Sequence, residues 1–454
     1  MPKAAKPATK TPRAVAKTAP GPRGKAHLSK SPAALDDEDL LELVQRQTFR
    51  FFWEGGHPVS GLAYDRRTTT DEPADDGVIA VGGSGFGVMC IIVAVERGWI
   101  SREAGIARLG TMLDVLLRAP CYHGALSHFM NGRTGATINF GRKDDGGDIV
   151  ETSFVTMGLL CARQYFGRDT EAERSLRGRI DWFWRDIEWS WYTQGDRRLL
   201  YWHWSPNNGW VMDHEIRGWN ECLITYVLAA SSPRYAIEPI AYHRGWAGGR
   251  DYLNGKTYYD TLLPLGPDLG GPVFFSHYSF LGLDPRGLKD RYADYWQQNT
   301  AQVAINRDWC IANPGGFKGY GPDCWGLTAS DDPDGYAPHA PGLGPDHDNG
   351  TITPSAALAS FPYAPEASMR ALRHFMALGD GGLWQRYGFI DAFCEQRGWY
   401  ADTFLAIDQG PIVVMIENFR TGLLWKLFMS VPEVQTGLRR LGFTSPWLDG
   451  AAGA

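Results

Sequence analysis

The chain has 454 residues, of which 44% are hydrophobic and 21% are charged, and its formal net charge at pH 7 is −6. This composition is typical of a soluble globular protein, and no apolar run reaches the roughly 18 residues that a membrane span requires. The length fits several ordinary domains or one large barrel, and the 18 Trp, 19 Tyr and 21 Phe residues predict that some rings line a binding surface.

Residues 1–35 differ from the rest of the chain. They include eight Lys or Arg residues, no Asp or Glu and no apolar run, which predicts a disordered basic tail. The other residues keep 37 of the 45 basic side chains against all 51 acidic ones, and this balance argues against nucleic acid as a partner of the folded domain. Because residues 1–35 lack the apolar segment of a secretory signal, we expect a cytoplasmic protein.

Apolar residues at helical spacing recur along the remaining chain, with helices expected in pairs. The predicted helices are 36–53, 84–97, 101–118, 149–166, 171–189, 219–230, 286–311, 354–360, 365–379, 402–428 and 432–441. The segments 189–218, 232–285 and 312–353 are rich in Gly, Pro, Asp and aromatic residues, which is typical of functional loops and short strands. This pattern predicts an all-α toroid of helical hairpins with long loops at one end.

The segment GVIAVGGSGFGVMCIIVAVER (77–97) resembles a dinucleotide-binding strand, glycine loop and helix. The spacing does not fit, because the third glycine of that motif would fall on Val88 and no second strand ending in an acid follows. We interpret these glycines as a tight start to a close-packed helix.

A group of acids precedes the predicted helix 149–166, in KDDGGDIVETSF. Asp144, Asp148 and Glu151 have i, i+4, i+7 spacing, which gathers carboxylates on one side of a helix start and raises the pKa of one or more of them if they are buried. A capping box made by Asp148 and Glu151 is the alternative interpretation. The preceding Gly146–Gly147 pair favours a close approach of the backbone to another group, which a cap does not need.

The segment 201–230, YWHWSPNNGWVMDHEIRGWNECLITYVLAA, combines tryptophans, an Asn pair and Glu221 before an apolar helix. Indole faces stack on sugar rings, and Asn binds hydroxyl pairs. A carboxyl between an aromatic wall and an apolar helix has a raised pKa, which suits Glu221 to act as a general acid. Across the whole chain the candidates for binding a substrate are Trp202, Trp204, Trp210, Trp325 and Tyr336 for stacking, with Asn208 and Arg217 for hydroxyl groups. Each could instead pack in the fold.

Asp408 precedes Gly410-Pro411 in the segment FLAIDQGPIVVM. Proline at a first helical position is a normal helix start, so we expect Asp408 to be displayed at a helix end. A simple N-cap is the alternative role.

Cysteine and histidine spacing argues against a metal site. The seven cysteines are far apart, without a Cys-x-x-Cys pair, and the histidines do not have the spacing of a zinc-binding helix. We therefore expect reduced, mostly buried thiols and no structural metal.

Several long segments resemble the glycoamylase-like family, that is, glycoside hydrolase family 144 and its relatives. They are VQRQTFRFFWEGGHPVSGLAYDR, KDDGGDIVETSF, YWHWSPNNGW, IRGWNECLITYVLAASSP, FFSHYSFLGLDPRGLKD, CWGLTASDDPDGY and AIDQGPIVVMIENFRTGLLWKLF. The resemblance implies an (α/α)6 barrel and an enzyme that cleaves β-1,2-glucan internally to short oligosaccharides, with inversion and with no metal or organic cofactor. It places the functional acids on Asp144, Asp148, Glu151 and Glu221.

We therefore expect a basic tail (1–35), a catalytic barrel (36–446) with room for short strands in its loops, and a flexible C-terminus (447–454). Glu221 is expected to protonate the leaving oxygen, and either Asp408 or the group of Asp144, Asp148 and Glu151 to activate water. A related barrel acts as a transglycosylase, so that activity is one alternative, and a non-catalytic carbohydrate-binding protein is another. The expected partner is an oligo- or polysaccharide. Relatives are often exported, which this chain's basic start does not suggest, and nothing in the sequence predicts a particular oligomeric state.

Overall fold

The computed structural model describes residues 35–448, apart from 75, 196–197, 250–251, 345–346 and 379–381. The predicted tail therefore lies outside the described residues, except for Leu35. Leu35 is buried, and its carbonyl accepts a hydrogen bond from Arg373 Nη2 at 3.2 Å. At the other end Leu448 is buried and Trp447 Nε1 donates to Asp284 Oδ2 at 3.1 Å. The folded chain thus extends two residues beyond the expected boundary at 446.

Helices are the main regular elements of the fold, as predicted. They are α1 (Asp37–Trp53), α2 (Val81–Glu96), α3 (Arg102–Leu116), α4 (Ile149–Tyr165), α5 (Glu171–Asp186), α6 (Leu223–Ser231), α7 (Pro239–Arg244), α8 (Tyr295–Ala312), α9 (Pro354–Leu358), α10 (Pro365–Ala377), α11 (Ala406–Arg420), α12 (Leu423–Met429) and α13 (Pro432–Arg440). In the described part of the chain, none of these helices combines the length and the apolarity needed to cross a bilayer.

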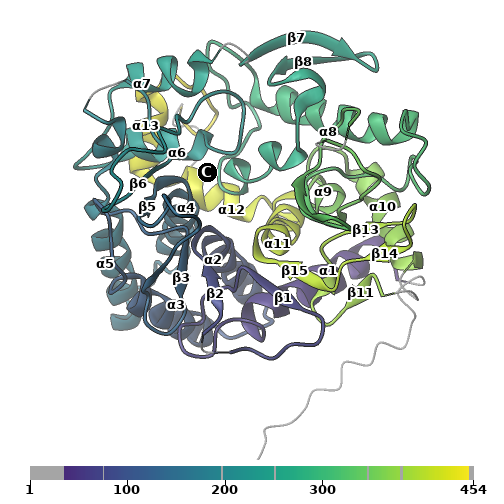
Figure 1. The fold of residues 1–454 in the computed structure, drawn as a ribbon. Coiled ribbons are helices and arrows are strands. Elements are labelled where there is room, and N and C mark those ends of the chain that lie inside the picture. The colour runs from purple at the N-terminus through teal and green to yellow at the C-terminus, as the bar shows by residue number, and fades with distance from the viewer. Residues whose placement is uncertain are drawn as a thin grey trace, which may run out of the picture.

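The helices follow one another around a ring as far as α11, which lies beside α1, and α12 and α13 then pack against α4 and α6 (Figure 1). Helix α2 packs against α4 on one side and α11 on the other, α4 continues to α6, and α11 contacts α9. Helices α1, α5, α10 and α13 pack against these inner helices from outside. Since α1 contacts both α2 and α11, the first helix closes the ring against the last long one.

Glycines let the backbones of α2 and α4 touch. A Cβ atom on Gly85 would lie 2.4 Å from the Phe154 carbonyl oxygen, and one on Gly158 would lie 2.3 Å from the Gly85 carbonyl oxygen. No side chain fits at such distances, so both positions require glycine. The interpretation of the 82–87 glycines as the start of a close-packed helix is confirmed.

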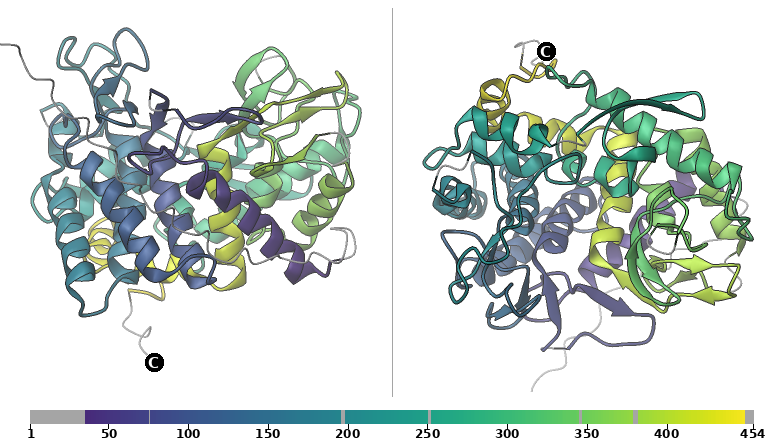
Figure 2. Two further views of the ribbon diagram at one scale, coloured as in Figure 1. Left: turned by 90° about the horizontal axis from the view of Figure 1, so that it is seen from below. Right: turned by 45° about the horizontal axis from the view of Figure 1, so that its top comes forward.

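Short antiparallel strands gather with the long loops at one end of the ring (Figure 2). They are β1 (Arg66–Thr68), β2 (Val78–Ala80), β3 (Phe129–Asn131), β4 (Thr137–Ile138), β5 (Gly147–Asp148), β6 (His203–Trp204), β7 (Leu253–Tyr258), β8 (Thr261–Leu265), β9 (Ala329–Asp332), β10 (Gly335–Pro338), β11 (Trp384–Gln385), β12 (Gly388–Phe389), β13 (Phe393–Cys394), β14 (Trp399–Tyr400) and β15 (Thr403–Leu405). Two pairings connect distant segments. Strand β1 pairs with β15, and β5 pairs with β6, which places Asp148 opposite His203.

Three helix predictions differ from the structure. The helix predicted at 286–311 begins only at Tyr295, because Asp294 caps it by accepting bonds from the Trp296 and Gln297 amides. The helix predicted at 402–428 is divided into β15, α11 and α12, and the break falls at Gly422, whose φ is +70°. Helix α7 lies in the segment that was predicted as loop, and it begins at a proline.

Candidate active site

Asp148 ends β5 and is the N-cap of α4. Its Oδ1 accepts hydrogen bonds from the Val150 and Glu151 amides, both at 2.9 Å. Its Oδ2 lies 2.9 Å from His128 Nδ1 and accepts a bond from Trp202 Nε1 at 3.1 Å. Both carboxylate oxygens are thus fully engaged, and the side chain has no exposed surface. Asp148 caps the helix and also fixes a histidine and a tryptophan at the site.

Glu151 connects the starts of two helices. Its Oε2 accepts a hydrogen bond from the Gly82 amide in α2 at 2.6 Å, whereas the Asp148 amide donates to the Leu126 carbonyl. The reciprocal half of a capping box is therefore absent from this pair. Burial raises the pKa of Glu151 to about 7, and the charge of Asp148 adds to the effect while His128 opposes it.

The acids around His128 raise the pKa of its imidazole. Burial lowers its pKa, but the charge of Glu151 and the hydrogen bond with Asp148 outweigh burial and raise it to about 9. The imidazole is therefore protonated at neutral pH and balances part of the negative charge of the acids.

Glu221 lies two residues before α6, in a backbone turn held on both sides. The Cys222 amide donates to Asn220 Oδ1 at 3.0 Å, and Ser279 Oγ donates to the Glu221 carbonyl. Burial raises the pKa of the Glu221 carboxyl to about 7, and the charges of Glu151 and Asp148 add to the rise. Glu221 is therefore close enough to these two acids to sense their charge, and it holds a proton up to neutral pH.

A hollow of about 870 Å³ adjoins this group of acids. Burial and the charge of Asp148 raise the pKa of Asp144, whose Oδ2 lies 4.0 Å from His203 Nε2. Aromatic, imidazole and polar groups form the walls: His128, Phe140, Gly141, Arg142, Lys143, Asp144, Asp148, Trp202, His203, Asn208, Met212 and His214. The β5–β6 pairing explains why the aromatic segment and the acids meet here.

A second group of acids surrounds Asp408, in the first turn of α11. Asp408 Oδ1 accepts a bond from Ser355 Oγ at 2.7 Å, and burial raises the pKa of this carboxyl to about 7. Asp391 Oδ2 accepts a bond from the Asp331 amide at 2.7 Å. Asp391 Oδ1 and Asp408 Oδ2 are both buried, and within the described residues no other group donates to them. Burial, followed by the charges of Asp408 and Asp331, raises the pKa of Asp391 well above its usual value. Asp391 and Asp408 therefore lie close enough for each to affect the pKa of the other.

Asp331 completes the second group. Its carboxylate accepts bonds from Arg66 Nη1 at 3.0 and 3.2 Å and from Thr403 Oγ1 at 2.6 Å. Arg66 is in β1 and Thr403 in β15, so the pairing of these two strands sets the position of Asp331.

Tyr278 connects the two groups of acids. Its ring packs among Phe86, Phe154 and Phe274, with centroid distances of 5.2, 5.8 and 4.9 Å. Burial raises the pKa of its phenol well above the usual value, and the charges of Asp408 and Glu221 both add to the rise. The phenol therefore lies near both carboxyl groups.

A second hollow, of about 460 Å³, lies beside the first. It is lined by Tyr64, Asp65, Arg66, Arg67, Asp71, Glu72, Ala74, Gly77, Val78, Phe129, Ile138 and Asn139. Its Phe129 ring contacts Phe140 and His128 of the larger hollow, with centroid distances of 5.5 and 4.5 Å. The two hollows thus adjoin along one aromatic wall.

The chain is similar to proteins that cleave β-1,2-linked glucose polymers. A family model described as putative glucoamylase matches residues 213–432. An endo-β-1,2-glucanase from Chitinophaga pinensis, solved with sophorotriose and glucose, is 52% identical, with a TM-score of 0.88 over 91% of this chain and 100% of that one. A putative glucoamylase from Bacteroides uniformis is 56% identical, with a TM-score of 0.87 over 91% of this chain and 99% of that one. The chain belongs to the glycoamylase-like family.

A further relative from Parabacteroides distasonis differs in length and in its described activity. It is an exo β-1,2-glucooligosaccharide sophorohydrolase that acts at the non-reducing end, and it is 47% identical over 426 residues, or 90% of this chain. The chain spans only 58% of that relative's length. The glycoamylase-like family thus includes proteins described as endo-acting and exo-acting on the same kind of glycosidic bond.

Of the predicted binding residues in this glycoamylase-like chain, some line the larger hollow and others do not. Trp202 and Asn208 line the larger hollow, where Asn208 Nδ2 donates to Ser205 Oγ at 3.1 Å. Trp204 and Trp210 are part of an aromatic cluster with Trp191, at centroid distances of 6.2 and 6.3 Å. The two rings are half-buried and are not among the residues that line either hollow.

Two predicted binding residues are corrected. Trp325 has no exposed surface and belongs to the hydrophobic core, because its large ring fills space beneath the loops and leaves no face for a sugar. Arg217 pairs with Glu215 and donates to the Arg244 carbonyl, and it is not among the residues that line either hollow. Tyr336 is 49% exposed, and the charges of Asp408 and Asp391 add to the rise that burial causes in its pKa. Its position beside the second group of acids keeps it a candidate.

The two predictions for Asp408 are also corrected in part. Leu405 is the N-cap of α11 and forms no side-chain cap bond, so Asp408 is not an N-cap. Pro411 lies inside α11 rather than at its start. Asp408 is nevertheless near the start of a helix, buried and close to other acids.

Several residues of the site were not identified from the sequence. His128, Tyr278, Asp331 and Asp391 lie in ordinary loop or apolar contexts, and only the fold brings them to the acids. Phe140 follows a strand and is 60% exposed on the wall of the larger hollow. No motif in the sequence marks Phe140, whereas Asp144, Asp148, Trp202 and Asn208 of the same wall were predicted.

Proposed function

We propose that this protein hydrolyses β-1,2-glucan internally, with inversion, to short β-1,2-gluco-oligosaccharides. The observation that carries the proposal is Glu221, a carboxyl whose pKa is raised to about 7 by burial and by the charges of Glu151 and Asp148, the second of which lies in the wall of a hollow lined by aromatic and polar groups. Its setting occurs in a chain that matches an endo-β-1,2-glucanase over that enzyme's whole length. We also infer that the ring of helices is an (α/α)6 barrel, which the succession of contacts from α9 through α11, α2 and α4 to α6 supports.

Glu221 acts as the general acid in this mechanism. A group that protonates a leaving glycosidic oxygen must hold its proton near the working pH, and burial gives Glu221 that property. The nearby acids contribute in two ways. Their charge helps to keep Glu221 protonated, and it stabilises the positive charge that develops on the sugar ring in the transition state.

Asp408 is the better candidate for the general base. Asp148 already accepts two amide bonds and contacts His128 and Trp202, so it has no free lone pair directed at a water molecule. Asp408, in contrast, accepts one bond, from Ser355 at Oδ1, and its Oδ2 has no donor among the described residues. Burial raises the pKa of Asp408 to about 7, so this carboxyl can take up a proton near neutral pH.

Two observations favour internal cleavage over release from a chain end. The two hollows adjoin along the Phe129–Phe140 wall, so several consecutive sugar units have surface to bind. The endo-acting relative is covered completely by this chain, whereas the exo-acting relative has a large part that the chain does not match.

The test is to incubate the purified protein with linear β-1,2-glucan and to follow chain lengths by chromatography and the anomeric protons by NMR. We expect the mean chain length to fall early, and the new reducing ends to appear as the α anomer. Sophorose as the sole early product would indicate exo action. Products longer than the substrate would indicate a transglycosylase, and binding without products a non-catalytic carbohydrate-binding protein.

A further inference from the structure

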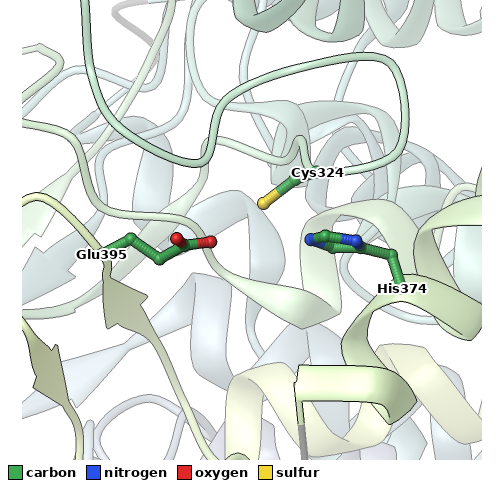
Figure 3. Close-up of side chains that lie close together, drawn as sticks. All are labelled: Cys324, His374 and Glu395. Carbon is green, nitrogen blue, oxygen red and sulfur yellow. The ribbon is translucent and has the colours of Figure 1, made fainter.

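Three potential metal ligands from separate segments of the chain converge on one point. Cys324 ends a tight turn closed by Gly321, His374 is in the last turn of α10, and Glu395 follows β13. One ligand atom from each residue lies within 4.8 Å of the other two. Figure 3 shows the thiol, one imidazole nitrogen and the carboxylate pointing toward a common centre.

The other contacts of these side chains do not account for this convergence. His374 Nε2 has no solvent contact and no hydrogen-bond partner. Arg370, one turn before His374, pairs with Asp323 at 3.0 Å rather than with Glu395. No ion pair to Glu395 occurs among the described residues. A buried thiol, an imidazole nitrogen without a partner and a half-buried carboxylate without a counter-ion thus meet at one point, which a cation between them would stabilise.

The donor set identifies the class of cation. Thiolate, imidazole and carboxylate together favour a borderline-soft divalent ion, of which Zn²⁺ is the commonest in proteins. Zinc bonds of about 2.0–2.3 Å in a tetrahedron bring donor atoms to roughly 3.5 Å from one another. Small side-chain rotations would bring the three atoms to that spacing from the present limit of 4.8 Å.

We propose that Cys324, His374 and Glu395 form a Zn²⁺ site whose fourth position is taken by water. Its role is structural. Cys324 lies five residues before β9, which carries Asp331, and Glu395 lies four residues after Asp391. A bound ion would fix both segments to α10, and so hold the loops that surround Asp408. None of the three ligands is among the residues that line the two hollows, so the ion would not take part in the reaction.

The sequence analysis predicted no metal because the ligands are separated by 50 and 21 residues and share no motif. The proposal concerns a different part of the molecule from the proposed function, and it can be tested without any glucan.

The experiment uses the full chain after removal of metal with a chelator. Zn²⁺ is added in competition with a chromophoric chelator, and thermal unfolding is followed in parallel. We expect one equivalent to bind and the melting temperature to rise with Zn²⁺ concentration. Glu395→Gln and His374→Asn should each weaken binding by at least about tenfold, since even the loss of an outer-shell partner costs that much at a zinc site.

Cobalt gives a second readout. Co²⁺ bound to a thiolate has a sulfur-to-metal charge-transfer band, which should appear in the wild type and be lost in Cys324→Ser. The matched control is Cys121→Ser, which removes an exposed thiol elsewhere and should change neither readout. If Cys324→Ser does not fold, the Glu395 and His374 variants give the answer. The proposal is wrong if Zn²⁺ does not bind, or if binding persists unchanged in the Glu395 and His374 variants.

Discussion

The raised pKa of Glu221, which general acid catalysis requires, lowers the stability of the folded protein near neutral pH. Its pKa is about 7 in the folded protein and about 4.3 in an unfolded chain. Between these values the folded state holds a proton that the unfolded state has released. The stability of the protein is therefore unaffected by this group below about pH 4, and it falls as the pH rises toward 7.

Glu221→Gln should lower the catalytic rate and raise the stability near neutral pH. Loss of the general acid should lower the rate of glucan cleavage by about a hundredfold or more while leaving oligosaccharide binding measurable. Because Gln does not ionise, the variant should be more stable than the wild type at pH 8 by roughly 1–3 kcal/mol, and the difference should shrink toward pH 4. Urea unfolding at both pH values, with exposed Glu171→Gln as the control, measures the second effect. Wild-type turnover would remove Glu221 from the mechanism.

Asp148→Asn tests an acid whose four contacts are now known. Asn keeps the cap, because its carbonyl oxygen can still accept from the Val150 and Glu151 amides. Its amide group, however, would face the N–H of Trp202 and the protonated His128. We therefore expect a loss of about 1–3 kcal/mol together with loss of activity, rather than the cost of about 1 kcal/mol or less that capping alone predicts. An active variant of normal stability would show that Asp148 is only a cap.

The same contacts show what can be predicted at the residue scale. Asp144, Asp148, Glu151 and Glu221 stand in local patterns of acids, glycines and aromatic residues, so the sequence indicates them. The surroundings of Asp408 depend instead on Ser355, Asp391 and Asp331, which are between 17 and 77 residues away. Only the packing of α9 against α11 and the contact of Asp331 with Asp391 bring these together, so no spacing rule could identify Asp391.

At the scale of elements, the contact between α2 and α4 depends on glycine. Gly85→Ala would place a methyl group 2.4 Å from the Phe154 carbonyl oxygen, and neither backbone can move without disturbing Glu151 and Gly82 at the site. We expect a loss of stability of about 3 kcal/mol, near the upper end for overpacked cores. Chemical denaturation measures the change.

Gly110→Ala is the matched control. Gly110 is also inside a helix, α3, but the nearest atom to an added Cβ is 3.9 Å away. Alanine should therefore stabilise the helix by about 0.5–1 kcal/mol. Equal effects of the two substitutions would contradict the close-packing interpretation.

Apolar periodicity predicted the long helices well and the interruptions badly. Helix α5 has one apolar face and one polar face, and its predicted and observed starts agree at Glu171. Helix α11 is buried on nearly every side, so its apolar run continues without a change of pattern into α12. The break between them is set by the left-handed conformation of Gly422, and one glycine in an apolar run does not reveal it.

At the scale of the whole molecule, the basic segment can be tested by deletion. The described contacts begin at Leu35, and residues 1–33 have the composition of a segment that contributes no core. Removal of residues 1–33 should leave the melting temperature and glucan cleavage unchanged at low and high salt. A truncated protein that unfolds earlier would show that these residues pack on the ring.

The closed ring has a consequence for biosynthesis. Strand β1 pairs with β15, and α1 packs on α11. The partners of these early segments are therefore synthesised more than 300 residues later. During that interval the apolar faces of α1 and α2 have only part of their final cover. Domains with such long-range pairing fold slowly and expose aggregation-prone apolar surface during folding. Chaperone capture of nascent chains truncated before residue 403, followed by release once β15 and α11 are present, is the behaviour to expect in the cell.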